Sequence, residues 1–162
     1  MNESRFVVNA SPLIFLAAID ALQLLPRLVD QVLLPEAVLG EVLAKTEPRL
    51  SLQILSSTAW VRIEPDVAVP EEVASWDLGA GETQVLAFGR SRGGVELVLD
   101  DRQARRCAES LGLPTTGTLG LILRAKWRGF IPAARPLVER LIEHRLYVAH
   151  DLVEAALAEV GE

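Results

Sequence analysis

Short apolar runs alternate along the chain with longer segments whose apolar residues recur at helical spacing. Runs rich in Val and Leu and bounded by turn residues predict buried strands. The predicted strands cover residues 6–9, 31–34, 60–63 and 95–99, with a very short fifth strand at 113–115. The run at 60–63 alternates between apolar and polar residues, so we expect a short or edge strand there.

The segments between these strands contain residues that typically begin and end helices. Ser11 followed by Pro12 predicts a helix capped by the serine; Asp20 is expected to cap a second helix through Leu28. Thr118 is expected to cap another helix, over 119–128. Further helices are predicted over about 35–43, 50–55, 79–92, 102–111, 136–144 and 151–160, and 67–78 is predicted to be a connecting segment. Strands alternating with helices predict an α/β fold with a mostly parallel sheet covered on both faces.

Length and composition fit a single globular domain. The chain has 162 residues, of which 50% are hydrophobic, and a mean hydropathy of +0.28. This is enough to build one core, so we expect one domain over 1–162, with the helices from about residue 133 as an extension of it. No apolar stretch reaches the roughly 18 residues that a bilayer span needs, and we expect no export signal at the N-terminus.

The numbers of cysteines and histidines and the net charge exclude some kinds of site. Cys107 is the single cysteine, so an internal disulfide is excluded and a cytoplasmic location is expected. With only two histidines, a Cys/His zinc site is also excluded. A net charge of −6 argues against broad electrostatic binding to a phosphate backbone. It is compatible with a nucleic-acid enzyme whose carboxylates hold metal ions.

Acidic and amide side chains follow the predicted strands at the edge where such sheets bind ligands. Asp100 and Asp101 come directly after the 95–99 strand, and Asn9 ends the first strand. Glu82 lies in the first turn of the preceding helix, and Glu41 lies on the helix after the second strand. Right-handed crossovers would bring these residues to one edge, where oxygen ligands suit Mg²⁺ or Mn²⁺.

A metal ion held there suits hydrolysis of a phosphodiester, because it can activate water and stabilise the charged oxygens. Three arginines on the next helix, Arg102, Arg105 and Arg106, could hold the flanking phosphates.

Each of these residues also has a purely structural interpretation. The two aspartates and Asn9 with Ser11 could cap helices, and Glu82 could be a first-turn acid favoured by the helix dipole. Glu41 and the three arginines could be solvated helix residues. A strand-end aspartate pair also occurs in phosphoacceptor receiver domains. That function needs acids early in the chain and a late strand-end lysine, whereas Lys126 falls within a predicted helix.

Six segments, taken in order, carry a family resemblance. Residues 7–14 (VVNASPLI) resemble the opening of a PIN domain, in the subgroup where N-x-S-P-L-I is common. Residues 34–43 (LPEAVLGEVL) resemble its second segment, and 78–84 (LGAGETQ) are similar to its L-x-x-G-E-x-(E/Q) segment. Residues 98–106 (VLDDRQARR) resemble its L-D-D-R-x-x-R-R segment, and 116–120 and 126–132 resemble its closing segments. Each motif is weak alone, but the ordered set covers nearly the whole chain.

The resemblance implies a PIN-like three-layer α/β/α sandwich and a Mg²⁺- or Mn²⁺-dependent ribonuclease. Many such proteins resemble the toxin component of type II toxin–antitoxin modules. By this resemblance Glu41, Glu82 and Asp101 would bind metal, with Asp100 beside them and Ser11 supporting the site. Which of the two aspartates binds the metal stays open, and Asp101 fits the register at the strand end slightly better. It also implies an RNA substrate, an antitoxin partner and a homodimer.

One position departs from the family pattern. The usual aspartate of the first strand is Asn9 in this chain. An amide oxygen can still bind a metal, but one negative charge is lost, which weakens cation affinity. The sequence therefore leaves two hypotheses: a metal-dependent endoribonuclease, or a catalytically weak or silent PIN-like module that binds RNA or a protein.

Overall fold

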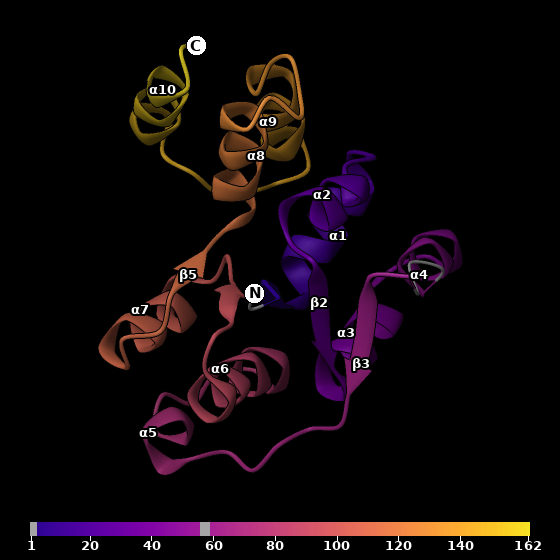
Figure 1. The fold of residues 1–162 in the computed structure, drawn as a ribbon, viewed down its shortest axis with the longest axis vertical. Coiled ribbons are helices and arrows are strands. Elements are labelled where there is room, and N and C mark those ends of the chain that lie inside the picture. The colour runs from indigo at the N-terminus through magenta and orange to yellow at the C-terminus, as the bar shows by residue number, and fades with distance from the viewer. Residues whose placement is uncertain (1–2, 56–58) are drawn as a thin grey trace.

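A computed structural model gives the fold over residues 3–55 and 59–162 (Figure 1). Five parallel strands form one sheet in the order β3-β2-β1-β4-β5. Their bounds are Arg5–Val8, Gln31–Pro35, Val61–Glu64, Glu96–Val98 and Thr115–Thr116 for β1 to β5. Val7 lies opposite Leu33 on one side and Leu97 on the other, and all three are buried. The predicted parallel α/β sheet, with its 60–63 strand at an edge, is confirmed.

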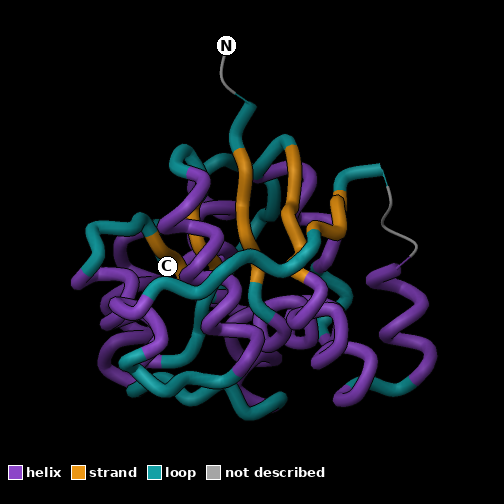
Figure 2. Tube along the Cα trace, turned by 90° about the horizontal axis from the view of Figure 1, so that it is seen from below, coloured by secondary structure: helices purple, strands orange, loops and turns teal. Residues whose placement is uncertain are grey.

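Helices flank this sheet and form with it a three-layer α/β/α sandwich (Figure 2). Helix α6 packs on β1, β2 and β4, whereas α1 and α2 contact α8, and α3 reaches both α1 and α6. The helices are α1 (Ala10–Ala18), η1 (Leu22–Leu24), α2 (Leu25–Leu28), α3 (Glu36–Lys45), α4 (Pro48–Leu55), α5 (Glu71–Ala74), α6 (Ala80–Arg92), α7 (Arg102–Ser110), α8 (Thr118–Trp127), α9 (Arg135–Glu143) and α10 (His150–Glu159).

The predicted helix caps at Ser11 and Asp20 are wrong. Helix α1 begins at Ala10, so Asn9 takes the cap position; its side chain makes no capping hydrogen bond because its amide donates to Glu82. Asp20 does not begin a helix; it has φ of 56° and ends the turn after α1, and η1 starts at Leu22. Pro26 then falls in the first turn of the short helix α2, where its missing N–H costs nothing.

Three further boundaries differ from the prediction. The predicted cap Thr118 is instead the first residue of α8, and its hydroxyl donates a hydrogen bond to Asp100. The fifth strand lies at Thr115–Thr116, about one residue later than expected, and the predicted connecting segment contains the single-turn helix α5. The ends of helices and strands are hard to predict from local sequence when contacts with distant residues determine them.

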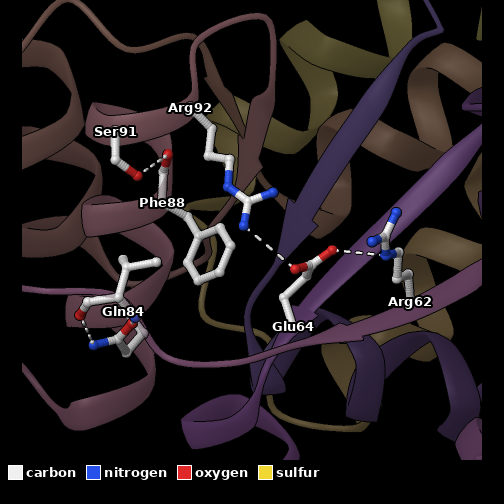
Figure 3. A network of polar contacts seen from close by, with 7 residues as sticks. Arg62, Glu64, Gln84, Phe88, Ser91 and Arg92 are labelled. Carbon is white, nitrogen blue, oxygen red and sulfur yellow. Dashed lines mark hydrogen bonds and ion pairs between the residues drawn. The ribbon is translucent and has the colours of Figure 1, made fainter.

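Polar contacts hold the edge strand β3 and the segment that follows it to α6 (Figure 3). Glu64 is 6% exposed; its Oε1 lies 2.8 Å from Arg62 Nε, and Arg92 Nη2 donates to its Oε2 over 3.3 Å. The side chain of Gln84 donates to the Val67 carbonyl and accepts from the Val67 N–H, at 2.9 and 2.8 Å. These contacts fix α6 along its length, so its first turn is held at the carboxyl edge of the sheet.

Within the described residues, no single helix has the length and apolar character needed to cross a membrane; one sharply bent pair, Ala10–Ala18 with Leu22–Leu28, meets the criteria by length and composition only.

Candidate functional site

The carboxyl ends of β1 and β4 lie side by side in the centre of the sheet. The Asn9 N–H donates to the Val98 carbonyl over 3.0 Å, which continues the pairing of these strands by one residue. Asn9 is only 1% exposed, and Asp100 follows β4 at the same edge. Both residues therefore lie at the carboxyl edge of the sheet, as predicted.

Three of the candidate side chains gather around the first turn of α6. Asn9 Nδ2 donates to Glu82 Oε1 over 3.2 Å, and the Gly81 N–H donates to Glu41 Oε1 over 2.9 Å. The first N–H groups of a helix have no partner within the helix and favour negative charge, so this turn stabilises the two glutamates. Lys45 Nζ lies 3.6 Å from Glu41 Oε2, one helical turn further along α3.

These groups approach the backbone of α6 closely because residue 81 is glycine. A Cβ on Gly81 would lie 2.8 Å from Glu41 Oε1 and 3.0 Å from Asn9 Oδ1, so both oxygens border the space that a side chain would fill. Asn9 Oδ1 is buried and has no hydrogen-bond donor among the described residues. A buried acceptor without a donor costs about 1–3 kcal/mol, so this oxygen is suited to a water molecule or a cation.

The residues around this space suit a hard divalent cation. They offer carboxylate and amide oxygens, the ligands that Mg²⁺ and Mn²⁺ prefer. Within residues 3–55 and 59–162, no group of three or more His, Cys, Asp and Glu side chains has the spacing of a metal site. The amide oxygen of Asn9 adds a further oxygen beside those of Glu41 and Glu82 at this turn.

A family model described as a PIN domain matches residues 5–162. The chain belongs to the PIN-domain family. PIN domains are generally nucleases and typically use divalent metals, so the coarse class of this protein is that of a nuclease. A search of curated proteins finds no match to it.

Asp100 of this PIN domain is bound by Thr118 at the start of α8. The Thr118 N–H donates to Asp100 Oδ1 over 2.7 Å, and the Thr118 hydroxyl donates to Asp100 Oδ2 over 2.6 Å. Burial raises the pKa of Asp100 above its ordinary value, while the two bonds from Thr118 and the charge of Arg105 act in the opposite direction. Asp100 thus links β4 to α8 and lines a groove on the surface beside it.

Asp101 has a different environment. It is exposed and takes the cap position of α7, where its Oδ1 accepts from the Ala104 N–H over 2.9 Å. Asp101 therefore has one oxygen committed to a helix cap, and its other oxygen carries no bond to a described residue. Its role as a ligand stays a prediction.

The predicted phosphate-binding residues lie on the surface of the PIN domain. Arg102, Arg105 and Arg106 are exposed on α7 and line the same groove as Asp100. Ser11 is exposed in the first turn of α1, and no described residue hydrogen-bonds to its side chain. Sequence reasoning missed Thr118 as the partner of Asp100. Its position just after the fifth strand, at the same sheet edge, was the available signal.

Proposed function

We propose that this PIN domain is a Mg²⁺- or Mn²⁺-dependent endoribonuclease and the toxin component of a type II toxin–antitoxin module. The observation that carries the proposal is the buried Asn9 Oδ1, which has no donor among the described residues and shares a small space with Glu41 beside the first turn of α6. Asn9 also donates to Glu82, so its amide bonds to one glutamate of the family pattern, while its oxygen and that of Glu41 both border the position of a Gly81 Cβ.

In this proposal Glu41 and Glu82 hold the metal beside the first turn of α6, with the Asn9 oxygen as a neutral ligand. Asp101, which the described structure does not bring into one metal-binding group with them, joins the ligand set when the cation binds. The free oxygen of Asp101 is available while the other caps α7. The bound metal supplies activation of water and stabilisation of charge on the phosphodiester.

The remaining side chains position the substrate and support the site. Arg102, Arg105 and Arg106 hold the flanking phosphates, and each cation so placed fixes the strand relative to the acidic edge. Thr118 holds Asp100 in one orientation through two bonds. Ser11 lies in the first turn of α1, two residues after Asn9, and supports the substrate side of the site.

The second candidate is a catalytically weak or silent PIN module that binds RNA or a protein. Asn9 favours it, since the neutral amide leaves one negative charge fewer than the family pattern has, and the described carboxylates form no cluster of three. The two candidates share the fold and differ in whether metal binding leads to cleavage.

An antitoxin and a second copy of the chain are the protein partners of this proposal. Antitoxin segments of an amphipathic kind lay an apolar face into a groove. Exposed apolar side chains on the surface, such as Leu43 and Ile142, are compatible with pairing to a second copy.

The test is a Mn²⁺ titration of the purified protein with cleavage of a mixed structured-RNA pool followed in the same samples. Glu82→Gln and Asp101→Asn remove one charge each at the site, and Glu143→Gln removes one from an exposed position on α9 as a matched control. Saturable Mn²⁺ binding and cleavage that the first two variants abolish and the control retains would support the nuclease. Binding without turnover on varied RNAs favours the silent module, and absence of Mn²⁺ binding rejects the metal site.

A further inference from the structure

A pocket of about 590 Å³ lies at the amino ends of the strands, on the edge of the sheet opposite to the candidate site. Phe6 of β1, Glu96 of β4 and Pro114, which precedes β5, line it. Figure 2 shows the chain entering the sheet at this edge, below the N-terminal label. The volume is in the range of small-molecule sites. The strands that end beside Asn9 and Asp100 therefore begin at a separate pocket.

The lining of this pocket is basic although the whole chain is acidic. Its charged side chains are three arginines and one glutamate, namely Arg5, Arg124, Arg128 and Glu96. The charge of Glu96 is already balanced, because Arg124 donates to both of its oxygens over 2.9 and 2.7 Å. The lining therefore has an excess of two positive charges in a protein of net charge −6.

The other two arginines, Arg5 and Arg128, form no ion pair with a residue that the structure describes. Arg5 Nε is buried, and no described group accepts its hydrogen. Arg128 Nη1 donates to the Leu28 carbonyl over 3.2 Å, which leaves its charge unbalanced. The carboxylate of Asp30 accepts from the N–H and hydroxyl of Ser4 instead. A buried donor without an acceptor, beside two unbalanced guanidinium groups, favours an anion in this pocket.

The rest of the lining selects among anions. Leu28, Val29, Val95 and Leu113 give the pocket an apolar wall, which suits an organic group attached to the anion. A phosphate monoester carries a charge of about −1.5 to −2 at pH 7 and has three acceptor oxygens. A single carboxylate carries one negative charge and would leave the second arginine unbalanced.

We propose that this pocket binds a small phosphate monoester, with the phosphate on Arg5 and Arg128 and the organic part against the apolar wall. Glu96 limits the positive charge of the site by holding Arg124. The site lies at the amino edge of the sheet, so it neither uses the acidic residues of the carboxyl edge nor depends on the proposed nuclease function.

The test is a calorimetric titration of the purified protein in EDTA with adenosine monophosphate, inorganic phosphate and adenosine as probes. We expect the two phosphates to bind and adenosine to bind at least about tenfold more weakly than its monophosphate. Arg5→Gln and Arg128→Gln should each weaken binding of the monophosphate about tenfold. Arg27→Gln is the matched control, because Arg27 is exposed and donates to a carbonyl, as Arg128 does, but does not line the pocket.

Glu96→Gln gives a second test that partial unfolding cannot imitate. It leaves Arg124 without its carboxylate partner, so binding of the monophosphate should tighten about fivefold, the effect of one more unit charge about 4 Å away in water. Glu82→Gln should leave binding unchanged, since Glu82 lies in the first turn of α6 at the carboxyl edge.

Three results would overturn the proposal: no binding of either phosphate, equal binding of adenosine and its monophosphate, or an equal loss in Arg27→Gln. A loss of binding in Glu82→Gln would also overturn it, because the phosphate would then sit at the acidic edge. None of these results bears on RNA cleavage, which the Mn²⁺ titration tests separately.

Discussion

Asn9 affects both the stability of the fold and the proposed metal site. Its amide donates to Glu82 while its oxygen, buried beside Glu41, has no donor among the described residues. Asn9→Asp would replace the donated hydrogen bond by repulsion between two carboxylates in a buried site. In EDTA we expect the free energy of unfolding to fall by about 1–3 kcal/mol. Urea unfolding followed by circular dichroism measures this loss.

Mn²⁺ should reverse the effect, because a cation between the carboxylates removes the repulsion and stabilises the folded state by mass action. We therefore expect Mn²⁺ to raise the midpoint of Asn9→Asp more than that of the parent, and metal-dependent cleavage to increase. Glu143→Gln serves again as the surface control. A loss of stability that Mn²⁺ leaves unchanged would show that no cation sits beside residue 9.

Gly81 and Gly40 form a natural pair of helical glycines for a second prediction. A Cβ on Gly81 would meet Glu41 and Asn9, whereas a Cβ on Gly40 meets nothing within 4 Å. Gly81→Ala should displace the Glu41 carboxylate and weaken Mn²⁺ binding at least about tenfold. Gly40→Ala should leave Mn²⁺ binding unchanged and stabilise the protein by about 0.5–1 kcal/mol. Calorimetric titration and urea unfolding separate the two, and equal Mn²⁺ affinities would contradict the role of the Gly81 space.

At this scale the sequence predicts which residues reach the sheet edge better than what they contact. Asn9 and Asp100 lie at the ends of neighbouring strands, as the topology requires. The bond between Asp100 and Thr118 joins residues 18 positions apart and depends on how α8 leaves β5. The Gly81 space depends on the approach of α3 to α6, which no local pattern encodes.

Among the elements, α7 combines a capped start, a buried inner face and a basic outer face. Asp101 accepts from the Ala104 N–H, and Ala104, Cys107 and Ala108 are buried. Asp101→Ala should therefore lower the free energy of unfolding by about 1 kcal/mol, whereas Asp101→Asn retains a capping oxygen and should cost only a few tenths. Urea unfolding of the two variants checks this.

This comparison also tells whether a loss of Mn²⁺ binding by Asp101→Asn reflects chemistry or structure. If Asp101→Asn unfolds as easily as Asp101→Ala, the side chain does not act mainly as a cap. The sequence predicted α7 within one residue because its cap and its apolar spacing agree. The predicted start of α1 was wrong. Ser11 is a favourable capping residue, but the helix begins at Ala10, and Asn9 takes the cap position while its side chain bonds to Glu82.

For the whole molecule, alternation of strands and helices was enough to predict the sheet, since apolar strands of this kind are stable only when covered on both faces. It was not enough to place the C-terminal helices. Their attachment depends on single polar contacts across long separations, such as Arg140 Nη1 to the Ile19 carbonyl over 3.0 Å. Residues 146–156, which help to line the groove beside Asp100, lie beyond α9, so no local sequence pattern predicts this groove.

Helix α10 is held to the start of α9 by two glutamates as well as by its buried Val153 and Leu157. Arg135 pairs with Glu154 at 2.9 and 3.2 Å, and Glu162 accepts from the N–H groups of Ala134 and Arg135. The hydrogen bond from Arg135 lowers the pKa of Glu154, and that from the Ala134 N–H lowers the pKa of Glu162.

A lowered carboxyl pKa means that the contact stabilises the fold above the ordinary glutamate pKa of about 4.3 and loses this effect as the pH falls through the folded-state value. We therefore expect α10 to loosen in acid before the sheet does. Methyl signals of Val153 and Leu157 followed by NMR in an acid titration should shift before those of Leu33 and Leu97. Glu154→Gln should show the looser state already at neutral pH, while Glu143→Gln should behave as the parent. Simultaneous loss of all four signals would mean that α10 and the sheet unfold as one unit, and that these glutamates do not control the groove wall.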